Sequence, residues 1–165
     1  MLAACGQPER DELWRVYDAP GGDYRLRYLE PPWELVDSEV TRARFIVQNN
    51  ASALGGRDSS LSAKYELTVD VEAGAPRARA MADERGASGR RETVVVGTRA
   101  VRTESGDEGF EVITRAETGE LLYRRFIYLS HPRGVVRLLF EAVPNLDGPE
   151  VKAMVAAVDV LPGVP

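Results

Sequence analysis

Most of the chain shows the alternation of apolar and polar positions that is typical of strands. Over residues 63–72 every second side chain is apolar, which predicts a strand with one buried and one solvated face. Short turns such as Gly106-Asp107 separate the last four strand-like segments, so we expect these to pair as antiparallel hairpins. The remaining predicted strands cover residues 24–28, 33–36, 42–48, 92–102, 108–115, 120–130 and 134–142.

Two segments repeat their apolar residues with the period of a helix. The first is expected to begin at Pro76 and to end at Gly86, with a narrow apolar stripe. The second is expected to run from a cap at Asp147 to about Leu161 and has a wider apolar face. The apolar residues are Ala78, Met81 and Ala82 in the first helix and Val151, Met154, Val155 and Val158 in the second.

These elements predict the α+β class, with an antiparallel sheet of about six to eight strands packed with two helices as an α/β/α sandwich. We expect a single domain over residues 18–165, preceded by a polar tether over residues 1–17 in which Trp14 and Tyr17 form a short helical turn. The length of 165 residues suits one domain. No apolar run approaches the roughly 18 residues of a membrane-spanning helix.

The composition excludes several functions. The formal net charge of −5 argues against nucleic-acid binding, which generally needs a basic surface. The single cysteine, Cys5, excludes a disulfide within the chain and a zinc site built from cysteines. The single histidine, His131, excludes metal sites that need two histidines, and we expect no metal and no cofactor.

The first residues suggest attachment to a membrane. Leu2-Ala3-Ala4-Cys5 resembles a lipobox, the cleavage motif of bacterial lipoprotein signal peptides, in which the cysteine thiol carries a lipid. The polar stretch after Cys5 is typical of a tether behind such an anchor. Gly6, rather than aspartate, follows the cysteine, which implies an outer-membrane lipoprotein that faces the periplasm.

This motif lacks the upstream part of a signal peptide. Only four residues precede Cys5, too few for a basic region followed by an apolar region of about 7–15 residues. Met1 is therefore an internal methionine or a misassigned start, or the motif is accidental. If Met1 is the true start, a cytoplasmic protein is expected.

The basic residues are unevenly distributed. Residues 76–103 contain seven arginines and three acidic residues, a local charge of +4, whereas residues 1–40 carry −5. This asymmetry suggests a surface that binds an anionic partner, although surface arginines that pair with the acidic segment would give the same pattern. Aromatic residues around Trp33 suggest a groove, or simply core packing. The candidate partner-binding residues are Arg77, Arg79, Arg85, Arg90, Arg91 and Trp33.

Two further groups have chemical potential. His131 is the only ordinary candidate for a general base, but it precedes Pro132 in a predicted turn, where a structural histidine is expected. Four carboxylates, which either ligate calcium or form a solvated acidic turn, lack the spacing of a known calcium loop. They are Glu104, Asp107, Glu108 and Glu111.

The order of elements resembles the PsbP/Mog1-like family, which includes many small bacterial lipoproteins of unassigned role. The residues that carry the resemblance are the strand over 24–28 followed by Pro32-Trp33-Glu34, the strand over 65–71 that leads into the helix over 76–86, and the ending from Met154-Val155 to Val160-Leu161-Pro162. The resemblance covers about residues 20–162 and implies a sheet sandwiched by helices. It also implies a binding or assembly module, and it supplies no catalytic residues.

The sequence leaves three functions open. The first is a non-catalytic, lipid-anchored envelope protein that binds or helps to assemble a protein partner. The second is a soluble cytoplasmic adaptor or chaperone-like binder on the same fold. The third is a small hydrolase that uses His131.

Overall fold

The computed structural model describes residues 14–30, 33–47, 65–74, 77–87, 93–116, 123–142 and 149–163. Within them the chain forms ten strands and two helices. The strands are β1 (Trp14–Asp18), β2 (Tyr24–Leu29), β3 (Trp33–Ser38), β4 (Arg42–Val47), β5 (Tyr65–Ala73), β6 (Thr93–Arg102), β7 (Glu108–Ala116), β8 (Tyr123–His131), β9 (Gly134–Ala142) and β10 (Val158–Val160). The helices are α1 (Ala78–Ala87) and α2 (Pro149–Ala156).

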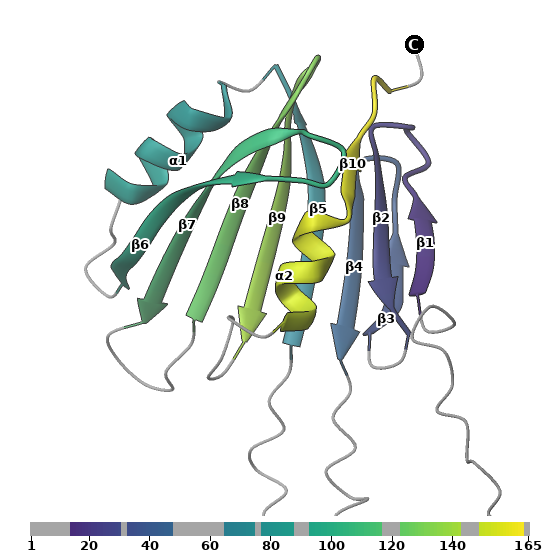
Figure 1. Cartoon of the computed structure of the whole chain (residues 1–165), viewed down its shortest axis with the longest axis horizontal. Coiled ribbons are helices and arrows are strands. Elements are labelled where there is room, and N and C mark those ends of the chain that lie inside the picture. The colour runs from purple at the N-terminus through teal and green to yellow at the C-terminus, as the bar shows by residue number, and fades with distance from the viewer. Residues whose placement is uncertain are drawn as a thin grey trace, which may run out of the picture.

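The strands form one large and one small antiparallel sheet. The large sheet has seven strands in the order β3-β4-β5-β9-β8-β7-β6, and the small one has the order β1-β2-β10 (Figure 1). After β5 the chain crosses through α1 to the far edge, and the meander of β6 to β9 then returns to pair with β5. This crossover places α1 over β6, β7 and β8, which follow it in the chain.

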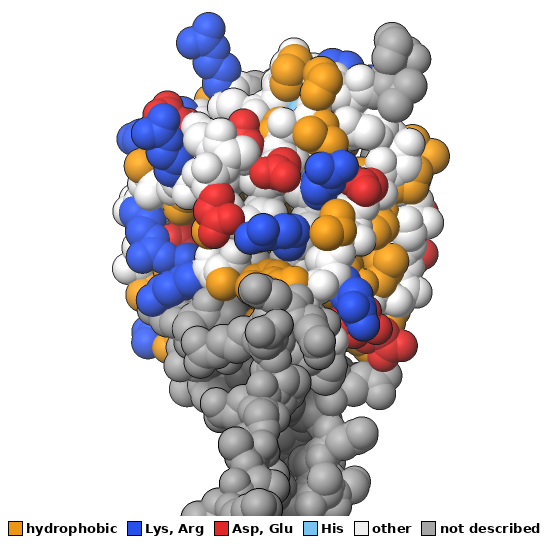
Figure 2. All heavy atoms as spheres, turned by 45° about the vertical axis from the view of Figure 1, so that its right-hand side comes forward, with side chains coloured by type: hydrophobic (Ala, Val, Ile, Leu, Met, Phe, Trp, Pro, Cys, Tyr) orange, Lys and Arg blue, Asp and Glu red, His pale blue; other side chains and the backbone are white. Residues whose placement is uncertain are grey.

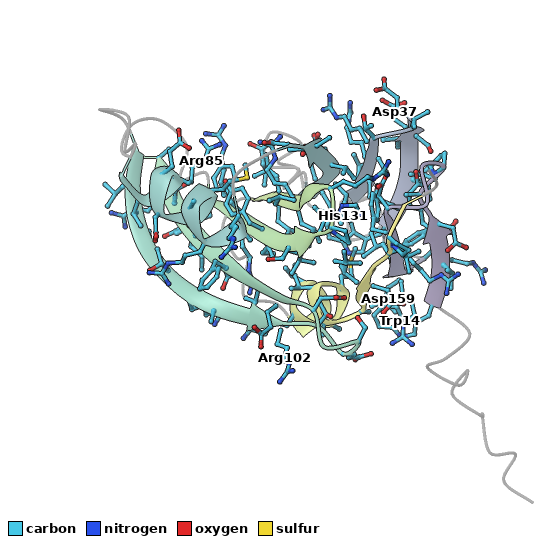
Figure 3. All side chains as sticks on the ribbon, turned by 90° about the horizontal axis from the view of Figure 1, so that it is seen from above. Trp14, Asp37, Arg85, Arg102, His131 and Asp159 are labelled. Atoms are coloured by element: carbon cyan, nitrogen blue, oxygen red, sulfur yellow. The ribbon has the colours of Figure 1, made fainter. Side chains whose placement is uncertain are left out.

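The two faces of the large sheet are covered by different elements. On one face α1 packs over β6, β7 and β8, where Ala78 and Ala82 lie against Val112, Phe126 and Tyr128. On the other face, α2 and the small sheet cover the main core, which includes the buried Leu67, Val69, Leu138 and Phe140. Seen from above, the two helices lie on opposite sides of the sheet (Figure 3).

Aromatic side chains join the two sheets. Phe45 of β4 is fully buried, and the rings of Tyr17 and Tyr28 from the small sheet lie 5.6 and 5.0 Å from it between centroids. Trp33 packs edge-on against Phe140 at 6.2 Å within the same core. Rings buried in this way contribute both apolar area and a preferred geometry, so they fix how the sheets are stacked.

The turn between β6 and β7 closes the open edge of β10. Ser105 donates through Oγ to the carbonyl of Val158 at 3.2 Å, and Asp107 accepts the Val160 N–H at 3.0 Å. These side chains satisfy backbone groups that a neighbouring strand would otherwise satisfy. The short strand β10 is thus held between β2 and a turn.

The expected fold class, strands and helices are confirmed, with differences at both ends of the domain. Residues 14–18 form β1, paired with β2 from Trp14↔Leu29 to Asp18↔Arg25, so the expected helical turn is wrong. Strand β1 therefore includes residues up to Tyr17 that the sequence pattern places in the tether. The last helix ends at Ala156, and Val158 belongs to β10. In each case pairing with β2 outweighs the local pattern.

Tyr24 offers a test of this core. Its ring is 1 % exposed, and its hydroxyl is buried without a hydrogen-bond partner among the described residues. Burial raises the pKa of Tyr24 above its usual value. The folded state therefore favours the neutral phenol, and the stability that this contributes is present below about pH 10 and is lost as the pH rises further.

We expect Tyr24→Phe to leave the free energy of unfolding at neutral pH unchanged or higher, because the orphan hydroxyl is removed. Above about pH 10 the variant should lose stability less steeply than the wild type. Tyr17→Phe is the control, since it loses a 2.7 Å hydrogen bond to Ser38 and about 1 kcal/mol. Urea denaturation measures the free energy of unfolding of both variants. Equal destabilisation by the two substitutions would contradict this account.

Candidate binding cleft beside helix α1

A polar cleft lies between α1 and the large sheet. Its volume is about 270 Å³, close to the lower end of small-ligand pockets. Strands β5, β8 and β9 supply one wall and α1 the other. The lining residues are Glu72, Met81, Glu84, Arg85, Tyr128 and Arg137.

Arg137 fixes the strand wall of the cleft. Its Nη2 donates to Asp70 at 2.7 Å, directly across the β5–β9 pair, and its Nη1 lies 2.8 Å from Glu72. Burial lowers the pKa of Arg137, but the hydrogen bond and the charge of Asp70 outweigh that effect and raise it above its usual value. The arginine therefore stays charged and holds two carboxylates in place.

Arg85 fixes the helix wall. Its Nε donates to the hydroxyl of Tyr128 at 3.2 Å, and its guanidinium lies 4.3 Å from the centre of the Phe126 ring. This stacking on an aromatic face leaves Arg85 half-buried at the mouth of the cleft (Figure 3). The cleft thus presents fixed charges of both signs, an arrangement suited to binding polar groups.

The structure divides the arginines that the sequence grouped together. Arg77 and Arg79 lie at the start of α1, whereas Arg85 lies in its last turn. Arg79 pairs with Asp83 at 3.0 Å and lies 4.8 Å from the Phe110 ring. Arg77 makes no ion pair with any residue that the structure describes. The other two predicted positions, Arg90 and Arg91, lie outside the described residues.

Trp33, the remaining candidate, is a core residue. It is 3 % exposed and packs in the main hydrophobic cluster. A partner would not reach its ring on the surface of this structure. Of the two interpretations of the aromatic residues near it, core packing describes the observed arrangement.

His131 links the two sheets. Its Nε2 lies 2.7 Å from the carbonyl of Leu161, and its Nδ1 accepts the Arg133 N–H at 3.0 Å. These partners place the ring proton on Nε2. Buried Asp23 lies 3.4 Å from Nε2 and also accepts a hydrogen bond from Arg133. Both ring nitrogens are engaged in the fold, so the geometry gives His131 a structural role.

The predicted acidic cluster is not a solvated turn throughout. Asp107 accepts the backbone N–H of Val160, and Glu111 is fully buried between Arg99 and Arg125. Within the described ranges no group of three or more histidine, cysteine, aspartate or glutamate side chains is placed to hold a metal ion. The partners of these two carboxylates are accordingly protein groups.

Sequence reasoning missed most of the cleft. Arg137 and Tyr128 occupy strand positions between apolar residues, and such an interruption is the only local signal for a polar site. Asp70 and Arg137 come from strands that are far apart in the chain, so their pairing follows from the crossover through α1. Cys5 lies outside the described residues, and among those described no helix has the length and apolar character to cross a bilayer.

The face formed by the small sheet carries charges of both signs. Figure 2 shows acidic and basic side chains interspersed with hydrophobic ones on that side of the molecule. Many of these charges pair with each other, as in Arg25–Asp18 at 2.6 Å and Arg27–Glu104 at 3.1 Å. Pairs of this kind contribute little energy and leave a neutral surface.

No family model matches the sequence, and no curated protein matches it significantly. Among solved structures, the solution structure of cyanobacterial PsbP (CyanoP) from Synechocystis sp. PCC 6803 aligns with a TM-score of 0.53 and 12% identity, over 97% of each chain. A crystal structure from Bacteroides thetaiotaomicron VPI-5482 has a TM-score of 0.45 and 9% identity over 90% of this chain, which spans only 48% of the other. The chain therefore has a PsbP-like fold.

We expect His131→Ala to lower the free energy of unfolding by about 1–3 kcal/mol, because it leaves the Leu161 carbonyl and the Arg133 N–H without partners. Urea denaturation measures the loss. Hydrogen exchange should show faster opening of the Leu161 amide, which bonds to the carbonyl of Asp23 at 2.8 Å. The exposed neighbour Ser130 provides the control, and a stability equal to that of Ser130→Ala would contradict the structural role.

Proposed function

We propose that this chain is a non-catalytic binding module that is anchored to the cell envelope by lipid on Cys5 and recognises an acidic surface of a protein partner with α1. The PsbP-like fold supports a binding role by analogy only. The engagement of both ring nitrogens of His131 argues against the hydrolase alternative, which has no other ordinary base. The soluble adaptor differs from the envelope protein only in its location.

The observation that carries the proposal is the placement of Arg77 and Arg79. The Arg77 carbonyl accepts the N–H groups of Ala80 and Met81, so Arg77 caps α1 at its positive end, and the first turn contains no acidic residue. Cations at this end of a helix are destabilising by about 0.3–1 kcal/mol each. An acidic partner that docks there would interact favourably with both the arginines and the helix dipole.

The cleft extends this surface along the helix. Arg85 and Glu84 bring charges of opposite sign to its mouth, so a partner side chain that enters must match a fixed polar pattern. Such a pattern contributes specificity more than affinity. In this proposal, the arginines at the start of α1 attract the acidic partner, and the cleft determines which partner side chain can bind.

The substitution Arg77→Glu should change folding stability and partner affinity in opposite directions. We expect a small gain in the free energy of unfolding, a few tenths to about 1 kcal/mol, because a carboxylate suits the helix start. Affinity for the envelope partner should fall by about tenfold or more, since the charge is reversed. Thermal denaturation measures the first effect, and titration of the purified partner measures the second.

Arg15→Glu provides the matched control, because Arg15 is also exposed but lies on β1 of the small sheet, which packs on the face of the large sheet opposite α1. It should leave partner affinity unchanged. If both reversals weaken binding equally, general electrostatic attraction accounts for it, and the assignment to α1 fails. If Arg77→Glu leaves binding intact, the proposal is wrong.

Metabolic labelling tests the anchor. When the gene is expressed with its native upstream sequence, the wild-type protein should incorporate labelled palmitate and enter the detergent phase of a Triton X-114 partition, because a lipid on Cys5 makes it amphiphilic. Cys5→Ser should remain in the aqueous phase and unlabelled. An unlabelled wild-type protein would favour the soluble adaptor.

A further inference from the structure

Each of the four sheet edges in the described structure has a feature that disfavours pairing with the edge of another sheet. The turn residues Ser105 and Asp107 cover β10. The edge strands β3 and β6 of the large sheet each contain a bulge, between Leu35 and Asp37 and between Val95 and Gly97. In contrast, β1 shows no bulge but has only five residues. Bulges and short edge strands are devices that prevent sheets from pairing edge to edge.

The bulge in β6 leaves a regular segment beyond it. From Gly97↔Ile113 to Arg102↔Glu108 the strand pairs with β7 without interruption. On its other side this segment pairs with no strand that the structure describes. An edge of this length can still accept an extended peptide, which bends to fit where a rigid second sheet cannot.

One side chain on this segment is held in a fixed position. The Nε of Arg99 bonds to Oε2 of Glu111, while Oε1 of Glu111 accepts from Arg125. Glu111 and Arg125 are 0% and 2% exposed, but the Arg99 side chain is 51% exposed. Buried ion pairs are costly to form. Here the buried Glu111 fixes the orientation of the exposed Arg99 guanidinium.

The two edges of the large sheet carry opposite charge. Strand β6 contains Arg99 and Arg102 and no acidic residue, whereas β3 contains Glu34 and Asp37 and no basic one. Among the described residues, Arg102 donates to the Gly106 carbonyl at 3.4 Å and forms no ion pair. An acidic segment is therefore attracted to β6 and repelled from β3.

We propose that residues 97–102 of β6 bind an extended acidic segment of the protein partner by strand addition, with Arg99 as the pre-oriented contact for a carboxylate. This rests on the proposed role as a protein-binding module and names a second part of its interface. The bulges in β3 and β6 disfavour a second copy of this chain as the occupant. The partner's segment supplies backbone groups to the edge and acidic side chains to Arg99 and Arg102.

A synthetic peptide of about eight residues with alternating valine and glutamate is a suitable probe. NMR should show protection of amides within residues 97–102 from hydrogen exchange when the peptide is added. Arg99→Gln should raise the dissociation constant about tenfold, because the fixed cation is lost while Glu111 and Arg125 remain paired. Urea denaturation verifies that this variant folds. Arg42→Gln is the matched control and should bind as the wild type does.

The other outcomes overturn the inference in distinguishable ways. Absence of binding, protection elsewhere, or equal binding of a valine–lysine peptide would overturn strand addition by an acidic segment. A mass that rises with concentration, with protection of both β3 and β6, would identify a second copy as the occupant. Envelope-partner binding that is lost in Arg77→Glu but kept in Arg99→Gln would overturn the role of β6 and leave the proposed function standing. Partner binding that Arg77→Glu leaves intact would sink the proposed function, while the peptide titration would still decide strand addition.

Discussion

The packing of Phe45 against Tyr17 and Tyr28 joins the two sheets, and the rest of the arrangement depends on it. The small sheet has three strands of three to six residues, and it needs a second layer against which to bury its apolar face. Its contact with Phe45 positions β2, and β2 in turn holds β10 and the end of the chain. His131, with its bond to Leu161, fastens the same end to the large sheet. One face of the large sheet is thus committed to the core.

The opposite face carries the polar features. Here α1 packs mainly over β6, β7 and β8, and the cleft lies between α1 and strands β5, β8 and β9. Arg137 and Arg85 are each tied to neighbours, so their charges are fixed in position. Arg77 and Arg79 occupy the helix end where a cation is disfavoured, and Arg79 is offset there by its pairing with Asp83. Arg77, which makes no ion pair within the described residues, is the cation on which the proposed recognition of an acidic partner rests.

Local pattern predicted the elements well, whereas long-range pairing decided the parts that were missed. Residues 67–71 alternate clearly, and their apolar members lie in the core, as do Val136, Leu138 and Phe140 of β9. Trp14 and Tyr17 are three apart, which matches a helical turn, but pairing with β2 makes them part of a strand. The cleft was not predictable, because Arg137 meets Asp70 only through a crossover that no local signal specifies. The local excess of arginines identified both Arg77 and Arg79 as candidates, but it could not show that Arg79 forms an ion pair with Asp83.

Site-specific photo-crosslinking in intact cells tests the central claim most directly. A photoreactive residue in place of the exposed Ala80 on α1 should form one discrete adduct with an envelope protein, because the proposed interface includes this helix. The same residue in place of Val16, which is 56 % exposed on β1, should form none. An adduct from position 16 with none from position 80 would contradict the account.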